Sequence, residues 1–292
     1  DVYQRTSKDL IMERQLPSAT GWTSVWDNIG KVRNTGLELS INTINVQTSD
    51  FSWQTNIIFD TNKNEILELY GGKKDDIGNK WFIGEAINVN YDYEFDGIWQ
   101  TSEADKAAIY GQTPGQVEVK DQNHDNVIDA KDKVILGQQL PKWTGSITNT
   151  FTYKNWDLAF NVYTRQGAQL NSTFVSSFMA YDGNYNQAKV DYWTETNPTN
   201  KYPQPGNKGK YFSSMCYQDV SFVRVGYITL GYTFPMSLLK PIGIKRLKLY
   251  ATANNPFLFT SFKGFDPEWA TQNTWGEATS TRTFLFGVKL AF

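Results

Sequence analysis

The chain has 292 residues, a net charge of −2 and a mean hydropathy of −0.50, which suits one large domain or two smaller ones. No apolar run approaches the roughly 18 residues of a transmembrane helix. This does not exclude membrane-spanning strands, because such strands alternate apolar and polar residues. A single cysteine, Cys216, excludes an intrachain disulfide. A single histidine, His124, argues against a His-rich metal site or a Ser-His-Asp triad.

Aromatic residues make up 15% of the chain, with 10 Trp, 16 Tyr and 18 Phe. This content suits the aromatic girdles of a membrane barrel or a surface that stacks on sugars, and a β-sandwich lectin would share it. The chain opens at Asp1 with neither a start methionine nor a signal peptide, so we expect a processed or partial chain.

The first part of the chain predicts an antiparallel hairpin. Residues 1–15 indicate a strand and residues 16–30, which contain proline and glycine, a loop. Residues 35–46 and 51–60 both alternate apolar and polar side chains, and the polar segment 47–50 between them is typical of a tight turn.

A long polar segment, residues 61–141, follows this hairpin. It contains a weaker extended stretch at 81–99 and a short helix at 102–110, where Ser102 and Asp105 resemble a capping box. Loops of this length in compact domains are usually functional, so we expect a functional role for this segment.

A second hairpin is predicted over residues 143–162, with Lys154 and Asn155 at its turn. A second long loop, 165–218, comes next. Residues 221–234 alternate as a strand until Val225, but Ile228 and the apolar residues after it fall on the opposite parity, which indicates a β-bulge.

The end of the chain continues the pattern. A turn at 235–245 leads into an alternating strand at 247–253, and a third long loop at 261–280 precedes the terminal strand 281–292. In this last strand one parity is apolar and ends on Phe292, whereas the other contains glycine and lysine. A barrel strand in an outer membrane can end in this way, whereas a soluble protein seldom ends on an exposed phenylalanine.

The lengths of the connections decide between the two all-β architectures. Counted along the chain, short turns alternate with long loops, so that all short turns fall at one end of an up-and-down series of about eight strands. This segregation is typical of outer-membrane barrels and is not expected of a β-sandwich. The fold class is therefore all-β, a transmembrane antiparallel β-barrel or part of one.

An acidic segment at residues 121–132 has the ligand spacing of an EF-hand calcium loop. It departs from that motif at position 6, which is Asn126 in place of glycine, and at position 12, where aspartate replaces glutamate. No helices are predicted beside it, so we expect a structural Ca²⁺ that fixes an external loop; a merely acidic surface turn is the alternative. His124 receives no role. The predicted ligands are Asp121, Asn123, Asp125, Val127 through its carbonyl, Asp129 and Asp132.

Several segments together resemble the SusC/RagA-type TonB-dependent outer-membrane transporters of Bacteroidota. They are NIGKVRNTGLEL at 28–39, YEFDGIWQT at 93–101, the acidic loop 121–132 with VILG at 134–137, YWTETNP at 192–198 with YP at 202–203, FVRVGYITLGYTFP at 222–235, GFDPE at 264–268 and the terminal strand. The resemblance spans nearly the whole chain but only the C-terminal part of the family's pattern. It implies a barrel of about 22 strands, of which about eight are present, and the plug, the TonB-binding segment and the earlier strands would be absent.

The resemblance also implies a function in the bacterial outer membrane: import of a bound oligosaccharide or peptide, energised by the TonB complex. A SusD-like lipoprotein would cover the long external loops, and the barrel-assembly machinery would read Phe292. Catalysis and nucleic-acid binding are not expected. The competing hypothesis is a soluble calcium-dependent β-sandwich carbohydrate-binding module. No local motif favours an enzyme, although a carboxylate pair for glycoside hydrolysis stays open on composition.

Two sets of residues are candidate contacts. Loop aromatics are candidates to stack on substrate, with packing inside the loops, lid contacts or interfacial anchoring as the alternatives; they are Trp81, Trp99, Tyr181, Tyr185, Trp193, Trp269 and Trp275, with Asp182, Asn184 and Asn186 as polar candidates. Apolar strand residues are expected to face lipid, and these are Trp53, Phe59, Trp156, Phe160, Phe284 and Phe292.

Overall fold

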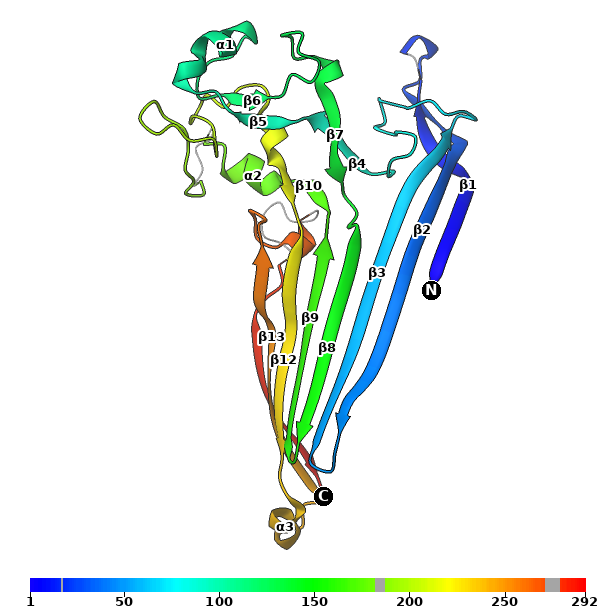
Figure 1. The fold of residues 1–292 in the computed structure, drawn as a ribbon, viewed down its shortest axis with the longest axis vertical. Helices are drawn as coiled ribbons and strands as arrows, with labels where there is room; N and C mark the ends of the chain where they lie inside the picture. Colours follow the sequence, from blue (N-terminus) through cyan, green and yellow to red (C-terminus); the bar gives the residue numbers. More distant parts are fainter. Residues whose placement is uncertain (17, 182–186, 271–278) are drawn as a thin grey trace.

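The computed structural model describes residues 1–16, 18–181, 187–270 and 279–292. Their main feature is a tall, curved sheet of eight antiparallel strands, in which every strand pairs with its neighbours in the order β1-β2-β3-β8-β9-β12-β13-β14 (Figure 1). The strands are β1 (Val2–Gln15), β2 (Ser24–Gln47), β3 (Phe51–Leu69), β8 (Trp143–Tyr153), β9 (Trp156–Gln166), β12 (Phe222–Thr233), β13 (Arg246–Thr260) and β14 (Thr283–Ala291).

The connections separate to the two ends of this sheet. The turns 48–50 and 154–155, the connection 234–245 and the C-terminus lie at one end, at the bottom of Figure 1, and the long connections lie at the other. The predicted eight strands and their up-and-down order are confirmed. A single sheet layer with exposed aromatics also overturns the β-sandwich alternative, which needs two sheets packed face to face.

The first hairpin is longer than predicted. β2 begins at Ser24, inside the predicted loop 16–30, and β3 continues to Leu69, so the first connection at the loop end shrinks to residues 16–23. The two strands stay paired as far as Gly30 and Leu69. About 10 residues of tilted strand cross a bilayer, so the extra length projects beyond it. There the apolar alternation ends while backbone pairing continues, supported by an ion pair between Arg33 and Glu65.

The bulge predicted in residues 221–234 is confirmed. The register of β12 shifts between Val225 and Tyr227 against both β9 and β13, which leaves Gly226 as the inserted residue on β12 opposite β9. The shift returns Ile228 to the face that carries Val225. A Cβ at Gly226 would come within 2.8 Å of Asn161 Oδ1, so the bulge is also tightly packed.

The helix predicted at 102–110 is present as α1 (Ala104–Ile109), preceded by a 3-10 turn, η2 (Thr101–Glu103). The predicted capping box is wrong by two residues. Gln100 and Glu103 form it, and the Gln100 amide donates to Glu103 Oε2 at 3.0 Å. The reason is the additional 3-10 turn, which moves the start of the helical segment towards the N-terminus.

Above the sheet, residues 89–142 of the first long connection and 167–221 of the second fold together into one compact unit, here called the loop body (Figure 1). It contains three two-stranded ribbons: β4 (Val89–Tyr93) with β7 (Lys133–Gln138), β5 (Phe95–Ile98) with β6 (Val117–Val119), and β10 (Gln169–Asn171) with β11 (Tyr217–Asp219). It also contains two short helices, α1 and α2 (Thr173–Phe178). The remaining short elements are α3 (Met236–Leu239) and the 3-10 turns η1 (Ser18–Thr20), η3 (Ala130–Asp132), η4 (Phe212–Cys216), η5 (Lys240–Ile242) and η6 (Pro267–Trp269).

Buried apolar residues concentrate in the loop body, not in the sheet. Its core is drawn from both connections and includes Ile98, Val117, Val175, Trp193 and Phe212. A smaller cluster of Val32, Ile66 and Leu69 lies at the loop end of β2 and β3 and is covered by Trp81 and its neighbours. None of the helices in the described part of the chain is long and apolar enough to cross a membrane.

Candidate functional site

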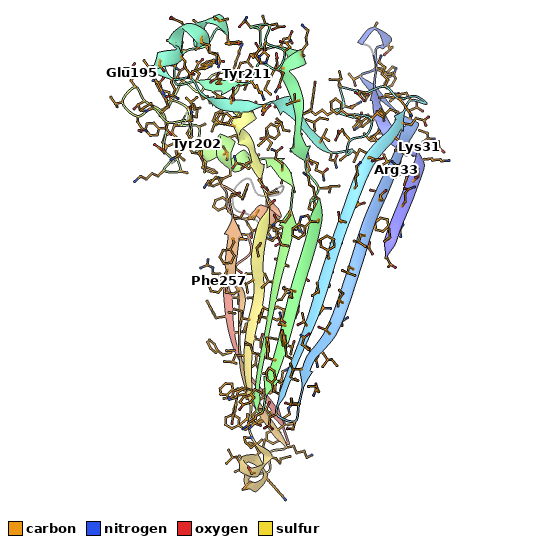
Figure 2. The ribbon with its side chains drawn as sticks, viewed as in Figure 1. Lys31, Arg33, Glu195, Tyr202, Tyr211 and Phe257 are labelled. Carbon is orange, nitrogen blue, oxygen red and sulfur yellow. The ribbon has the colours of Figure 1, made fainter. Side chains whose placement is uncertain are left out.

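One face of the sheet is apolar across all but the first strand. Residues paired across antiparallel strands share a face, and the register aligns the apolar parity of each strand with that of the next. This face is uncovered: Phe284 is 67% exposed, Phe286 84% and Phe257, labelled in Figure 2, 52%. A continuous apolar surface of this extent marks an interaction surface with another apolar phase or partner.

The predicted lipid-facing residues fall on this apolar face. In the strand register, Trp53 lies opposite Phe151, Trp156 opposite Tyr153 and Leu158 opposite Phe151. Trp53 and Phe160 both stack on Phe151, with ring centroids 5.7 and 6.2 Å apart. The other predicted residues on or beyond this face are Phe59, Phe284 and Phe292, the last of which follows β14 and is 75% exposed. That these residues contact lipid stays a prediction.

The opposite face of the sheet is polar and internally hydrogen-bonded. Lys248 and Asp157 form an ion pair at 2.7 Å, and Asn161 donates to Thr148 at 2.9 Å. Further pairs of the same kind link Thr229 with Thr252, Asn42 with Asn56 and Thr144 with Asp60. A wall that is apolar on one side and hydrogen-bonded on the other separates an apolar phase from an aqueous one.

Two of the predicted substrate aromatics are core residues of the loop body. Trp99 is 1% exposed, stacks on Tyr110 and donates its indole N–H to Gln112 Oε1 at 3.1 Å. Trp193 is 2% exposed and donates to Gln100 Oε1 at 3.0 Å. Their ring faces are occupied by protein atoms, so the structure assigns them the packing role that was the alternative to substrate stacking.

Trp193 also marks the place where the two long connections join. Asn200 Oδ1 accepts hydrogen bonds from the Ile98 amide at 3.1 Å and from Gln100 Nε2 at 2.9 Å, and the Gln204 amide donates to the Gly115 carbonyl at 2.8 Å. Gly115 has φ +86° and packs so closely that a Cβ would lie 2.7 Å from Trp193 Cε3. The two connections therefore share backbone bonds as well as a core.

The other predicted aromatics lie in three different places. Trp81 packs on the small cluster of β2 and β3. Tyr181 is half-buried in the loop body beside Tyr192, at 5.3 Å between ring centroids, and Trp269 is 40% exposed and donates to Ser280 Oγ at 3.2 Å. The described aromatics do not form one stacking platform. The remaining candidates, Tyr185, Trp275, Asp182, Asn184 and Asn186, lie outside the described residues.

The predicted calcium loop is a tight turn at the edge of the loop body, held by its own carboxylates. Asp121 accepts the amides of His124 at 2.7 Å and Asn126 at 2.9 Å, and buried Asp132 accepts those of Gln122 at 3.0 Å and Asp129 at 2.8 Å. Burial raises the pKa of Asp121, but these amides and the Tyr110 hydroxyl outweigh it and hold that pKa below its usual value.

Position 6 of this loop has the conformation that the motif requires, since Asn126 has φ 63° in place of the usual glycine. The predicted ligands Asn123 and Asp125 accept amides of the same turn, and Lys131 Nζ lies 3.5 Å from Asp129 Oδ2. No group of three or more His, Cys, Asp or Glu residues in the described ranges is arranged to hold a metal ion. The all-oxygen donor set and the left-handed Asn126 fit Ca²⁺ chemically, and its binding stays a prediction.

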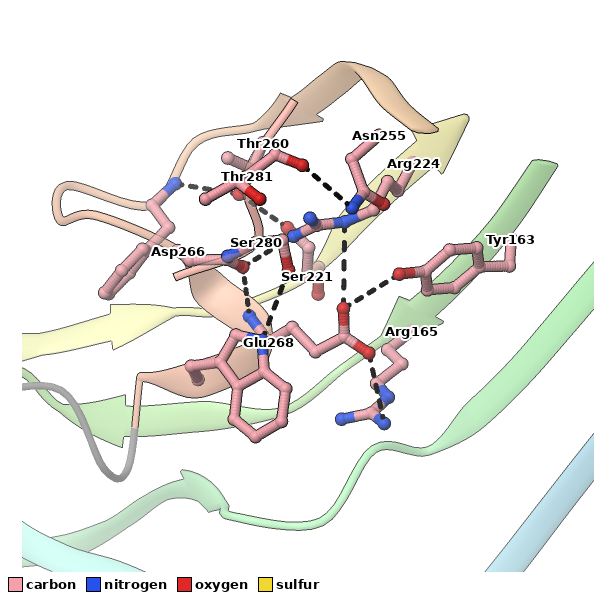
Figure 3. A network of polar contacts seen from close by, with 12 residues as sticks. Tyr163, Arg165, Ser221, Arg224, Asn255, Thr260, Asp266, Glu268, Ser280 and Thr281 are labelled. Carbon is pink, nitrogen blue, oxygen red and sulfur yellow. Dashed lines mark hydrogen bonds and ion pairs between the residues drawn. The ribbon is translucent and has the colours of Figure 1, made fainter. Parts of the chain in front are cut away.

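The third long connection is fastened to the polar face by a buried ion-pair network that the sequence reasoning missed (Figure 3). Arg224 on β12 is 2% exposed, and its Nη2 lies 2.5 Å from Asp266 Oδ1. Its Nε lies 3.7 Å from Glu268 Oε2, which accepts the Tyr163 hydroxyl at 2.8 Å and whose other oxygen is 3.6 Å from Arg165. We call these five residues the clasp.

Asp266 is the junction of the clasp. Besides Arg224, it accepts the amides of Glu268 and Ser280, each at 3.0 Å, so it caps η6 and holds both ends of the third connection. Burial raises the pKa of Asp266, but these amides and the guanidinium outweigh it and lower the pKa below its ordinary value. The sequence signals were an arginine among the apolar residues that begin β12 and the GFDPE segment at 264–268, which contains both carboxylates.

Comparison with known proteins supports the assignment of the sheet to an outer-membrane barrel. No family model matches the chain. It is 31% identical over 284 residues to the TonB-dependent receptor P26 of Formosa agariphila, covering 92% of this chain and 29% of that protein. It is 29% identical to the TonB-dependent receptor SusC of Bacteroides thetaiotaomicron, covering all of this chain and 30% of SusC.

Among solved structures, that of the RagAB peptide transporter superposes on the whole chain with a TM-score of 0.77 and 25% identity, covering 33% of the matched chain. The chain thus spans about a third of the length of the relatives it matches. Its sheet is part of the wall of a larger barrel, and these relatives are outer-membrane proteins of Bacteroidota. The chain belongs to the SusC/RagA-type TonB-dependent transporters of the bacterial outer membrane and fits the C-terminal portion of their barrel.

Proposed function

We propose that this chain forms barrel wall and external loops of a transporter that imports a bound oligosaccharide or peptide across the outer membrane, driven by TonB. The observation that carries the proposal is the sheet, which is exposed and apolar on one face, hydrogen-bonded and polar on the other, and topped at one end by an ordered loop body. The relatives are named as receptors and transporters, and we assign no catalytic role.

A SusD-like surface lipoprotein would cover the loop body, and TonB would act through the rest of the transporter. Uptake of labelled oligosaccharides and peptides by whole cells tests the proposal. We expect uptake of a cognate oligomer to fall to background when the transporter gene is deleted or when TonB is lacking. Uptake that persists unchanged without TonB would contradict energised import. Co-purification of the SusD-like lipoprotein with the transporter from membranes would test whether the two proteins form a complex.

The acidic loop is proposed as a structural calcium site. Asp121, Asn123, Asp125, Asp129 and Asp132 would supply side-chain oxygens, and Val127 its carbonyl, to a cation that neutralises the crowded carboxylates and fixes this edge of the loop body.

Calorimetric titration of the metal-stripped transporter with Ca²⁺ tests the site. We expect binding heat with Ca²⁺ that is lost in Asp125→Asn and kept in Asp105→Asn, an acidic residue on the neighbouring helix α1. Mg²⁺ is expected to bind much more weakly, because it is smaller and demands near-ideal octahedral geometry. No heat at millimolar Ca²⁺ would reject the site.

A further inference from the structure

A groove crosses the apolar face near the end of the sheet that carries the short turns. Its volume is about 540 Å³, and residues of β9, β12, β13 and β14 line it. In the strand register, Ala251 of β13 lies between Leu230 of β12 and Phe286 of β14, so the three share the apolar face. The small alanine between two larger side chains leaves the depression, and its volume lies in the range of small-molecule sites.

Two hydrogen-bond donors border the groove on its turn side. Trp156 and Tyr232 both line it, lie opposite each other in the register and have ring centroids 4.7 Å apart. Neither the indole N–H of Trp156 nor the hydroxyl of Tyr232 forms a hydrogen bond within the described part of the chain. Such rings, apolar with one polar tip, suit the depth at which hydrocarbon meets the polar groups of a membrane.

Two lysines follow, closer still to the turns. Lys154 Nζ lies 5.5 Å from the centre of the Tyr153 ring, and Tyr153 is opposite Trp156 on the apolar face. The Lys245 amide donates to the Ala291 carbonyl at 2.8 Å, which extends the pairing of β13 with β14 by one residue. Because alternate strand residues share a face, Lys245 falls on the same face as Leu249.

This end of the sheet has an excess of positive charge. The turn 154–155 and the connection 234–245 together contain three lysines and no Asp or Glu. Asp50 is in the neighbouring turn, where its carbonyl accepts the Lys154 amide at 2.7 Å. Among the residues that the structure describes, neither Lys154 nor Lys245 forms an ion pair. Lysines that extend from an apolar surface place their ammonium groups at the level of lipid headgroups, where an anion can pair with them.

The order of these groups selects the class of ligand. Towards the turns, an apolar groove is followed by two hydrogen-bond donors and then by two ammonium groups. A glycerophospholipid has the complementary order of acyl chain, ester carbonyls and phosphate. A free anion would leave the groove unfilled, and an uncharged amphiphile would leave the lysines without a partner. Short turns of outer-membrane barrels face the periplasm, so the matching lipid belongs to the periplasmic leaflet.

We propose that this groove and its two lysines bind one anionic phospholipid of the periplasmic leaflet. An acyl chain lies over Ala251, Trp156 and Tyr232 donate to the ester carbonyls, and Lys154 and Lys245 bind the phosphate. The inference goes beyond the proposed import function, because it depends only on the position of the sheet in a barrel wall and not on what the transporter carries.

Lysine substitutions test the headgroup contacts. Lys154→Gln and Lys245→Gln remove the charge and keep most of the side-chain length. Lys289→Gln is the matched control, because Lys289 lies near the same end of the sheet but on its polar face, with Nζ 5.6 Å from the centre of the Tyr250 ring.

Filling the groove tests the acyl-chain contact. Ala251→Phe places a ring where the chain would lie, on a face that already carries many aromatic residues. Ile57→Phe is its control, because Ile57 is an apolar-face residue of β3, opposite Ile147 and away from the groove.

The measurement is native mass spectrometry of the full-length, delipidated transporter, titrated with phosphatidylglycerol or with phosphatidylcholine of the same acyl chains. We expect wild type to bind one phosphatidylglycerol in preference to phosphatidylcholine. Each lysine substitution should weaken phosphatidylglycerol binding about fivefold, the usual contribution of one lysine at an anionic membrane surface. Ala251→Phe should abolish this binding, and both controls should match wild type.

Three results would reject the site. The first is equal phosphatidylglycerol affinity in Lys154→Gln, Lys245→Gln and Lys289→Gln. The second is binding of glycerol phosphate as tight as that of the whole lipid, which would show an anion contact without an acyl chain. The third is a changed oligomeric state in Ala251→Phe with unchanged bound lipid, which would assign the groove to a second copy of the chain. None of them would contradict TonB-driven import, which the uptake assay measures separately.

Discussion

Arg224 is the residue on which the clasp depends, because it places a buried positive charge beside two carboxylates of the third connection. Removing one member of a buried ion pair leaves the other charge uncompensated and typically costs about 3–5 kcal/mol. We therefore expect Arg224→Ala to release the connection around residues 261–270 while the sheet stays folded. Hydrogen exchange of these residues should rise by orders of magnitude. Arg246→Ala, at an exposed position at the other end of β13, should leave exchange unchanged.

The clasp also has a predictable pH response through Asp266. Its pKa is lowered in the folded protein, so its stabilising contribution is complete above the unfolded pKa of about 3.9 and is lost as the pH falls through the lower folded value. We expect proteolysis of this connection to be equally slow at pH 7 and pH 5 and to accelerate only in stronger acid. Release already at pH 5 would mean that another group controls the connection.

At the residue scale, sequence reasoning worked where the chemistry was local. The spacing of residues 121–132 is visible in one stretch of chain, and the left-handed Asn126 agrees with it. Arg224 was missed because its partner Asp266 lies 42 residues further on.

At the scale of elements, the alternation of each strand sets which face meets the apolar phase. Leu158 on β9 pairs with Phe151 and Leu230 on the apolar face. An arginine at such a site should cost roughly 2–4 kcal/mol at the middle of a bilayer. We expect Leu158→Arg to lower the yield of folded transporter in vesicles, whereas Ala159→Arg, one residue along on the polar face between Thr150 and Thr229, should be tolerated. Equal folding of the two variants would show that the faces are assigned wrongly.

Two glycines of the first long connection allow a second test at this scale. Gly115 and Gly111 both have positive φ, +86° and +65°, but a Cβ at Gly115 meets Trp193 whereas one at Gly111 meets nothing within 4 Å. Gly111→Ala should cost only the backbone strain, about 1–2 kcal/mol. Gly115→Ala should cost clearly more, because it also pushes Trp193 out of the core. Thermal unfolding followed by tryptophan fluorescence measures the difference.

The elements that sequence reasoning placed well are those with a solvent- or lipid-facing alternation. Both hairpins, the bulge in β12 and the terminal strand were predicted from period-two patterns. The ribbons of the loop body are not predicted, because strands of three to six residues are too short for a period-two pattern to be recognised. The halves of β2 and β3 nearest the loop body are predicted as loop because their residues are mostly polar. In the structure the backbone hydrogen bonding between these two strands nevertheless continues.

At the scale of the whole molecule, the sheet and the loop body have opposite organisation. The sheet places its apolar residues outside and its hydrogen bonds inside, whereas the loop body buries its apolar residues in a conventional core. Each part suits its surroundings: the first a membrane, the second water. The loop-length pattern in the sequence predicts the barrel wall and the long loops at one end of it, but not that two of these loops share a core. The RagAB transporter structure has the same fold over the whole chain.

The shared core of the loop body constrains how such a transporter can change what it binds. Residues 98, 117, 175, 193 and 212 come from two separate insertions that fold as one. A chimaera that exchanges only one insertion would lose the core residues of that insertion. The apolar core residues of the other insertion would then be exposed to water. Recombination that changes the loop body must therefore exchange both insertions together, along with strands β8 and β9 between them.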